Sequence, residues 1–253
     1  MAIYIILAIA ALLTSMISAI LGMAGGILLL ATMFCFMSHA DSIPTHAAVQ
    51  MASNGTRVLA FVRNVDRVAY GRFVLGALPG ACIGMLLLWL LGQPEESEPY
   101  LKTIVGAFIL FATFKPKRAG GGSSSEKWSD FPAIGLLAGT AALTVGTIDP
   151  LIAPTFARQG FVKERLIATK AICQLTIHTL KIPAFIWLRD LDLEKLGLLT
   201  LVMICMVIPG TLLGKRVVKN VSERHFKIAY KVALTFAGLK VLIFDGLLDL
   251  PIW

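Results

Sequence analysis

The sequence is poor in charged residues, and in acidic ones above all. Only 15% of its 253 residues are charged, with 15 Asp and Glu against 23 Lys and Arg, whereas 57% are hydrophobic. Soluble domains carry about 25% charged residues, and the mean hydropathy of this chain is +0.80. This composition excludes a water-soluble domain of this size and predicts a protein of the lipid bilayer.

Cysteines and the motifs of enzymes and metal sites are also scarce. The four cysteines are isolated in apolar segments, without CxxC spacing or histidine partners, which disfavours disulfides and a metal site. No GxSxG or HExxH motif and no paired acidic cluster lies inside the apolar segments, which disfavours an intramembrane enzyme. We therefore expect no catalytic residues, no metal and no cofactor.

The net charge of +8 suggests either a nucleic-acid partner or a membrane topology signal. The basic residues cluster in short connections between apolar runs, where the positive-inside effect places them. The charge therefore indicates topology, and we expect no nucleic-acid partner.

Long apolar runs are what the sequence has in abundance. Ten apolar segments predict an all-α polytopic membrane protein, whose first segment has no basic n-region and is expected to be retained. Five segments come before residue 115, near 2–21, 26–37, 43–62, 72–92 and 100–114. Five follow, near 131–146, 149–157, 165–188, 195–214 and 225–244. A Gly/Ser-rich linker of native or engineered origin, residues 115–130, separates repeats at 1–114 and 131–253.

The pattern TxAxxQ occurs twice, as "THAAVQ" from Thr45 and "TKAICQ" from Thr169. The two copies are separated by 124 positions (169 minus 45), and other matches keep this offset. They are Gly22 with Gly146, Phe61 with Phe185 and Asp66 with Asp190. Later, "PGACIG" at Pro79 matches "PGTLLG" at Pro209. We interpret these matches as an internal repeat.

Loop charges predict how the two halves are oriented. In the first half the loops "RNVDRVAYGR" and "KPKR" are basic and "QPEESEP" is acidic. In the second half "RDLDLEK" and the C-terminal end are acidic, and "KRVVKNVSERHFK" is basic. Equivalent loops thus fall on opposite sides, as in an inverted-topology repeat with an odd number of segments per half. The linker is then cytoplasmic.

The first two segments of each half are expected to form hairpins, because the second has only about ten residues and cannot span a bilayer. Helix N-termini at the hairpin tips suit an anion, which makes Gly25 and Gly26 candidate substrate-binding residues. The alternative is that these glycines only permit close helix packing. At the second tip, Asp149 before Pro150 is either a helix cap or a proton-coupling group.

Each repeat carries a polar stripe at helical spacing i, i+4 and i+7. A charge near the bilayer centre costs about 2.5–3.5 kcal/mol on insertion scales, so the stripes are expected to face each other or water. Amides, imidazole and cations donate to oxyanions. We therefore assign substrate binding to the members of the two stripes: Gln50, Asn54 and Arg57 in the first half, and Gln174, His178 and Lys181 in the second.

Other readings of these residues stay open. The glutamines can bond across helices, His178 can be a structural histidine or a proton-coupling group, and Lys181 can snorkel to the interface. Lys170 and Arg63 lie near segment ends and are expected to snorkel. His46 has no clear partner in the sequence.

The chain resembles the TauE/SafE sulfite exporter (TSUP) family of membrane transporters. The resemblance rests on "GMAGGILLL" after the first segment, the two TxAxxQ motifs and the two "PG" segments, and covers nearly the whole chain. The second tip, "VGTIDP", departs from the glycine-rich pattern of the family.

The resemblance implies transport of sulfite, sulfoacetate, taurine or similar sulfonates across a prokaryotic cytoplasmic membrane. We expect alternating access, with rocking about Gly80, Gly84, Gly210 and Gly214. An anion-selective channel and a carrier for another carboxylate or oxyanion remain alternatives. Small residues on many helices leave a homodimer open as well.

Overall fold

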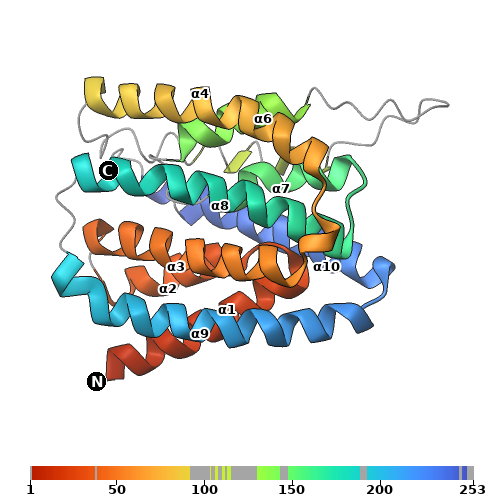
Figure 1. Ribbon diagram of the computed structural model, residues 1–253, viewed down its shortest axis with the longest axis horizontal. Coiled ribbons are helices and arrows are strands. Elements are labelled where there is room, and N and C mark those ends of the chain that lie inside the picture. Colours follow the sequence, from red (N-terminus) through yellow and green to blue (C-terminus); the bar gives the residue numbers. More distant parts are fainter. Residues whose placement is uncertain are drawn as a thin grey trace.

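A computed structural model describes residues 2–37, 39–91, 103, 106–107, 110–111, 113–114, 130–142, 148–188, 193–244 and 247–249 (Figure 1). Within these ranges the chain is helical apart from short turns, and no strand occurs. The all-α class predicted from the apolar runs is confirmed. The linker at 115–130 lies outside the described residues, except for Asp130, and so does most of the segment at 100–114.

The helices follow the predicted segments, with ends that differ by up to six residues. In the first half they are α1 (Ala2–Leu21), α2 (Gly25–Phe34), α3 (His39–Ala60), the 3-10 turn η1 (Val62–Asn64) and α4 (Arg67–Leu91). In the second half they are α6 (Asp130–Ala141), α7 (Asp149–Arg158), α8 (Lys163–Leu188), α9 (Leu193–Asn220) and α10 (Glu223–Leu239). A π-helical turn, η2 (Lys240–Phe244), and a 3-10 turn, η3 (Leu247–Asp249), follow.

Helices α2 and α7 are too short to cross a bilayer. Each has 10 residues, which is about 15 Å of helix against a hydrocarbon core of about 30 Å. Helix α2 packs against α1, and α7 packs against α6, so each half begins with a helix pair. The first pair turns at Gly22 and Ala24, both with a φ of 73°, a conformation that favours glycine.

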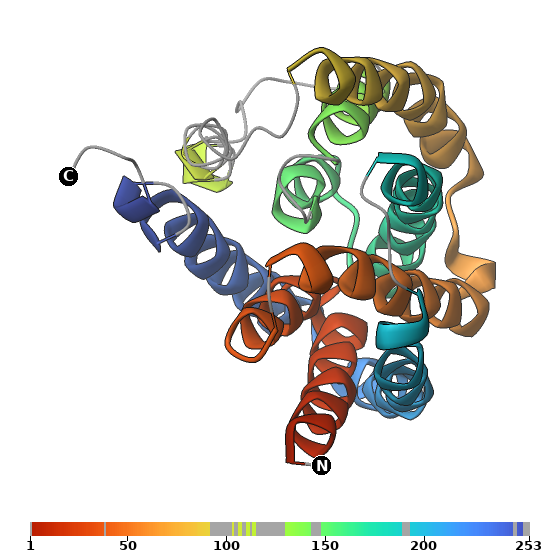
Figure 2. The same cartoon turned by 90° about the vertical axis from the view of Figure 1, so that its left-hand side faces the viewer.

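The longest helix contacts join the two halves of the chain. Helix α1 packs along α9, and α4 packs along α6. Figure 2 shows these two pairs at opposite edges of the molecule, with α3 and α8 between them. Glycines let the backbones touch: a Cβ at Gly80 would lie 2.3 Å from the carbonyl oxygen of Leu136, and one at Gly210 would lie 2.3 Å from that of Leu12. These glycines are contact points between helices.

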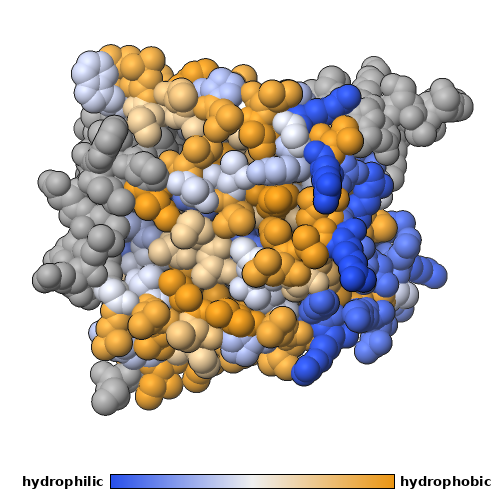
Figure 3. Space-filling view, viewed as in Figure 1, coloured by the Kyte–Doolittle hydropathy of each residue, from blue (hydrophilic) through white to orange (hydrophobic). Residues whose placement is uncertain are grey.

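The outer surface has the character of a membrane protein. An apolar belt covers most of the face in Figure 3, and hydrophilic residues gather at one end. By length and composition, three described helices are apolar enough to cross a membrane: Ile3–Leu21, Arg67–Leu87 and Gly197–Asn220. Helices α3 and α8 are as long, with 22 and 26 residues, but they bury polar side chains at the centre of the protein.

Apolar side chains form two buried clusters. One, which we call the lower cluster, joins α1, α2, α3 and α9; it consists of Leu7, Ala11, Leu29, Met33, Val49, Leu199, Met203 and Val207. The other draws residues from α2, α4 and α6 to α10 and contains three phenylalanines packed edge to face. Their ring centroids are 5.3–5.9 Å apart: Phe131, Phe156 and Phe161. The polar stripes of α3 and α8 lie between these apolar regions.

Candidate functional site

Helices α3 and α8 cross in opposite directions. Near the start of α3, the ring of His46 meets the ring of His178 edge to face, with centroids 6.2 Å apart. Beyond the end of α3, the backbone N–H of Asp66 donates to Thr169 Oγ1, near the start of α8, at 2.9 Å. Early residues of one helix therefore face late residues of the other, which makes the pair antiparallel.

This antiparallel register brings the two glutamines of the TxAxxQ motifs to one level. Gln50 lies one turn after His46, and Gln174 lies one turn before His178, so the histidine contact places both at the crossing. Gln50 is 4% exposed and Gln174 is 1% exposed. Both amides therefore lie inside the protein and away from lipid.

The rest of the first stripe is also buried. Asn54 and Arg57 have no exposed surface. The guanidinium of Arg57 donates through Nη2 to Asn54 Oδ1 at 2.5 Å and through Nε to the Ser53 carbonyl oxygen at 3.4 Å. These contacts hold the arginine side chain along α3 and set its orientation within the protein.

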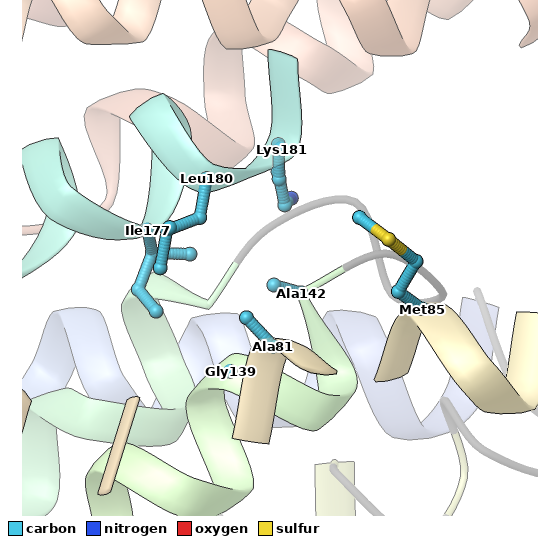
Figure 4. A pocket seen from close by; sticks show the side chains of 7 residues that line it. All are labelled: Ala81, Met85, Gly139, Ala142, Ile177, Leu180 and Lys181. Atoms are coloured by element: carbon cyan, nitrogen blue, oxygen red, sulfur yellow. The ribbon is translucent and has the colours of Figure 1, made fainter. Parts of the chain in front are cut away.

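The second stripe places a cation beside a small apolar space. Lys181 is buried, so the reading in which it snorkels outward is wrong. Figure 4 shows it pointing from α8 towards side chains of α4 and α6. The cavity there is about 10 Å³ as sampled by a water-sized sphere, close to the least that holds one water molecule. Its lining is Ala81, Met85, Gly139, Ala142, Ile177, Leu180 and Lys181.

Basic side chains of α3 and α8 lie near His178. Lys181, His46 and Arg57 all act on its ring electrostatically, so cationic groups of both stripes share one buried region. Among the described side chains, the buried ones of Arg, Lys, Asp and Glu type are all basic: Arg57, Lys170 and Lys181. No group of three or more metal-ligating side chains occurs in the described part of the chain. This set of donors suits an oxyanion.

Two residues lie in places that the sequence did not predict. The prediction that Lys170 snorkels is wrong, because it is fully buried and its Nζ donates to the Gly22 carbonyl oxygen. His46, for which no partner was apparent, contacts the Gly26 carbonyl oxygen through Nε2 at 2.8 Å. Both follow from the approach of the α1–α2 tip to α3 and α8. The internal repeat contains the signal that could have predicted this inward placement, since His46 and Lys170 occupy equivalent positions, 124 apart.

The tip glycines have packing contacts in this structure. A Cβ at Gly25 would lie 2.0 Å from the Thr14 carbonyl oxygen, so α2 packs tightly on α1 there. The Gly26 carbonyl faces His46. The role of Gly25 and Gly26 in binding an anion stays a prediction. At the second tip, α7 begins at Asp149, but the Asp149 side chain and residues 143–147 lie outside the described residues.

Asp66 links helices at the end of the crossing where α3 ends and α8 begins. Its Oδ1 accepts from the backbone N–H groups of Val68 and Ala69, which caps α4, and its Oδ2 pairs with Arg165 at 2.6 Å. Burial raises the pKa of this carboxyl, but the hydrogen bonds from Ala69, Arg165 and Val68 and the charge of Arg165 outweigh burial, and the pKa is lowered overall. Asp66 thus ties the loop after α3 to the start of α8.

A family model described as "Sulfite exporter TauE/SafE" matches residues 7–241. The match runs from within α1 into the π-helical turn after α10, and it contains every residue of the two stripes. No curated protein and no solved structure gives a match. The described helices are apolar on the outside and bury cationic and amide donors. The chain belongs to the TauE/SafE sulfite exporter family of multi-pass membrane transporters.

Proposed function

We propose that the protein is a secondary transporter that moves a sulfur oxyanion or a sulfonate, such as sulfite, sulfoacetate or taurine, across the prokaryotic cytoplasmic membrane. The observation that carries the proposal is the crossing of α3 and α8, where Gln50 and Gln174 lie buried at one level, close to His178. Amide and cationic donors aimed into a protein interior match the oxygens of a sulfonate or sulfite group.

The helix contacts support an inverted repeat. Gly80 packs on the carbonyl of Leu136 and Gly210 on that of Leu12, and Leu12 and Leu136 keep the 124-residue offset of the TxAxxQ motifs. One turn on, Gly84 packs on the Thr140 carbonyl and Gly214 on the Met16 carbonyl, which again differ by 124. The pairs α3–α9 and α8–α4, and α1–α2 and α6–α7, correspond in the same way. We propose repeats at 1–114 and 131–253 joined by a cytoplasmic linker.

This arrangement supports alternating access. Because backbone contact at glycines couples α1 to α9 and α4 to α6, we propose that each pair moves as one body around the α3–α8 crossing. The anion then meets one side of the membrane at a time. We also propose proton coupling through His178 and Asp149, and a homodimer.

Exchange in proteoliposomes tests the function. We expect saturable exchange of labelled internal and external anion, and expect it to be strongest for one member of a panel of sulfite, sulfate, thiosulfate, sulfoacetate and taurine. Continuous single-channel currents would favour the alternative of an anion-selective channel, and a carboxylate that outcompetes the panel would favour a different substrate class.

Four variants test the site. Gln50→Ala and Gln174→Ala each remove hydrogen bonds to a charged group, worth about 1.5–3 kcal/mol, so binding is expected to weaken by about tenfold or more. Arg57→Ala and Lys181→Ala remove cations and are expected to weaken binding further. Gly55→Ala on α3 is the control, because a Cβ there meets nothing within 4 Å. If the best ligand stabilises all four variants as well as it stabilises the parent, the site assignment is wrong.

A further inference from the structure

Three of the helices that form the lower cluster each carry a hydroxyl side chain one turn after a residue of that cluster. Ala11 on α1, Val49 on α3 and Val207 on α9 belong to the lower cluster. Side chains four residues apart share a helix face, so the hydroxyls follow the apolar cluster as the next layer. This layer consists of Ser15, Ser53 and Thr211, with Ser18 one turn after Ser15 on α1 and against Gly25 of α2, and we call these four residues the hydroxyl layer.

The three helices run in the same direction, which puts the hydroxyls at one level. Gly210 packs against Leu12 and Ser15 of α1, and Gly214 packs against Met16, so α1 and α9 advance together. Helices α3 and α9 also both contribute residues to the lower cluster. Further along both helices they contact each other again, where Lys215 Nζ donates to the Ala60 carbonyl oxygen at 2.5 Å. The hydroxyl layer lies between these two groups of contacts.

Most of these hydroxyls lack the partner that a membrane helix usually gives them. Ser15 donates to the Leu12 carbonyl oxygen at 2.9 Å, as serine and threonine commonly do within a helix. In contrast, the side-chain oxygens of Ser18, Ser53 and Thr211, and Asn54 Nδ2, are buried without a hydrogen-bond partner in the described part of the chain. Buried polar groups normally have a hydrogen-bond partner in the protein or in ordered water, so an orphaned group points to strain, a water molecule or a bound ion.

The side chains next to the hydroxyl layer indicate which class of ligand fits there. One turn after Ser53 comes Arg57, which is fully buried, and one turn after Thr211 comes Lys215. Hydroxyl and amide donors next to cations bind an acceptor with negative charge and several oxygens, and they disfavour a metal cation.

The equivalent region of the second half is apolar. If the repeat relates the halves, Ser15, Ser18, Ser53 and Thr211 correspond to Gly139, Ala142, Ile177 and Ala81. These four residues line the small cavity beside Lys181 (Figure 4). The fold therefore does not require polar side chains at these positions, and the first half carries donors that the second half lacks.

We propose that the hydroxyl layer is an additional oxyanion-binding site between α1, α3 and α9. It shares Asn54 and Arg57 with the polar stripe of α3 and lies beyond the two glutamines, towards the end of α3 where Lys215 contacts Ala60. It rests on the proposed function only in taking its ligand to be the transported anion. The oxyanion group of inorganic sulfite or of an organic sulfonate presents the same acceptors, and the pathway is asymmetric because only one repeat supplies the donors.

Calorimetry and thermal shift on the detergent-purified full-length protein test this site with sulfite, sulfate, sulfoacetate and phosphate as probes. Thr211→Val replaces a hydroxyl by a methyl group of similar size. We expect the melting temperature without added anion to rise, because an unsatisfied buried donor is gone, and we expect the affinity for the best anion to fall about tenfold. Ser53→Ala should also weaken binding, and it serves as the second variant if Thr211→Val does not fold.

Thr56→Val on α3 is the matched control, because Thr56 Oγ1 already donates to the Ala52 carbonyl oxygen at 2.8 Å; its affinity should equal that of the parent. If both hydroxyl-layer variants bind within twofold of the parent, the layer holds only water and the proposal is overturned. If Thr211→Val weakens binding but proteoliposomes carry no anion, the site stands and the transport function fails. A parent that binds none of the four probes overturns both.

Discussion

Gly210→Ala is the substitution whose outcome the structure determines most closely. A methyl group at this position would lie 2.1 Å from Ser15 Oγ and 2.3 Å from the Leu12 carbonyl oxygen. The serine side chain can rotate, but the carbonyl belongs to the hydrogen-bonded backbone of α1. The two helices must therefore separate along the contact that joins the halves of the chain.

The size of the effect follows from two opposing terms. Overpacking in a tight contact costs about 1–3 kcal/mol, and we expect a clash with backbone to fall at the upper end, about 3 kcal/mol, because the carbonyl cannot rotate away. Replacing glycine by alanine inside a helix gains about 1 kcal/mol, so the net loss should be about 2 kcal/mol. Gly80→Ala should lose a similar amount, since its methyl group would lie 2.3 Å from the Leu136 carbonyl oxygen.

Thermal unfolding of the purified protein in detergent measures this loss, with Gly197→Ala as the control in α9. A Cβ at Gly197 meets nothing within 4 Å, so only the gain in helix propensity remains and this variant should be slightly more stable than the parent. If Gly210→Ala and Gly197→Ala unfold at the same temperature, the close α1–α9 contact is wrong, together with the repeat argument built on it.

Three further substitutions probe other parts of the fold. Asp66→Asn should be less stable than the parent at neutral pH. Because the pKa of Asp66 is lowered in the folded state, its contribution is present above the unfolded value of about 4 and is lost as the pH falls through the lower folded value; equal stabilities at pH 7 would contradict this. Phe156→Ala should cost about 3–5 kcal/mol in thermal unfolding, against little for the exposed Leu59→Ala. Tyr230→Phe loses the hydrogen bond to the Ala153 carbonyl oxygen and should cost about 1 kcal/mol; a cost below 0.3 kcal/mol would show that this bond contributes nothing.

The sequence predicted the helices well because apolar runs and their ends are local signals. Helix α1 begins and ends at the predicted residues, and α8 begins within two residues of its predicted start. The repeat also predicted that Gln50 and Gln174 lie inside the protein, since their stripes are too polar for lipid, and both are buried.

What the sequence missed depends on tertiary contacts. Lys170 lies near a helix end, where lysine usually reaches water, but the tip of the α1–α2 pair brings the Gly22 carbonyl to it first. The hydroxyl layer was missed for a related reason. Serine and threonine are common in membrane helices and usually bond to their own backbone, so only the packing of α1, α3 and α9 distinguishes Ser53 and Thr211 from an ordinary case such as Thr56.

An experimental structure with a bound selenium oxyanion tests the central claim most directly. Selenite and selenate resemble sulfite and sulfate, and the anomalous scattering of selenium locates them without ambiguity. We expect a selenium peak inside the protein. It should lie within hydrogen-bonding distance of donors of the α3–α8 crossing, which include Gln50 and Gln174, or of the hydroxyl layer beside Arg57. A crystal grown with saturating selenite or selenate, in which the selenium peaks lie only on the basic outer surface, would contradict the claim.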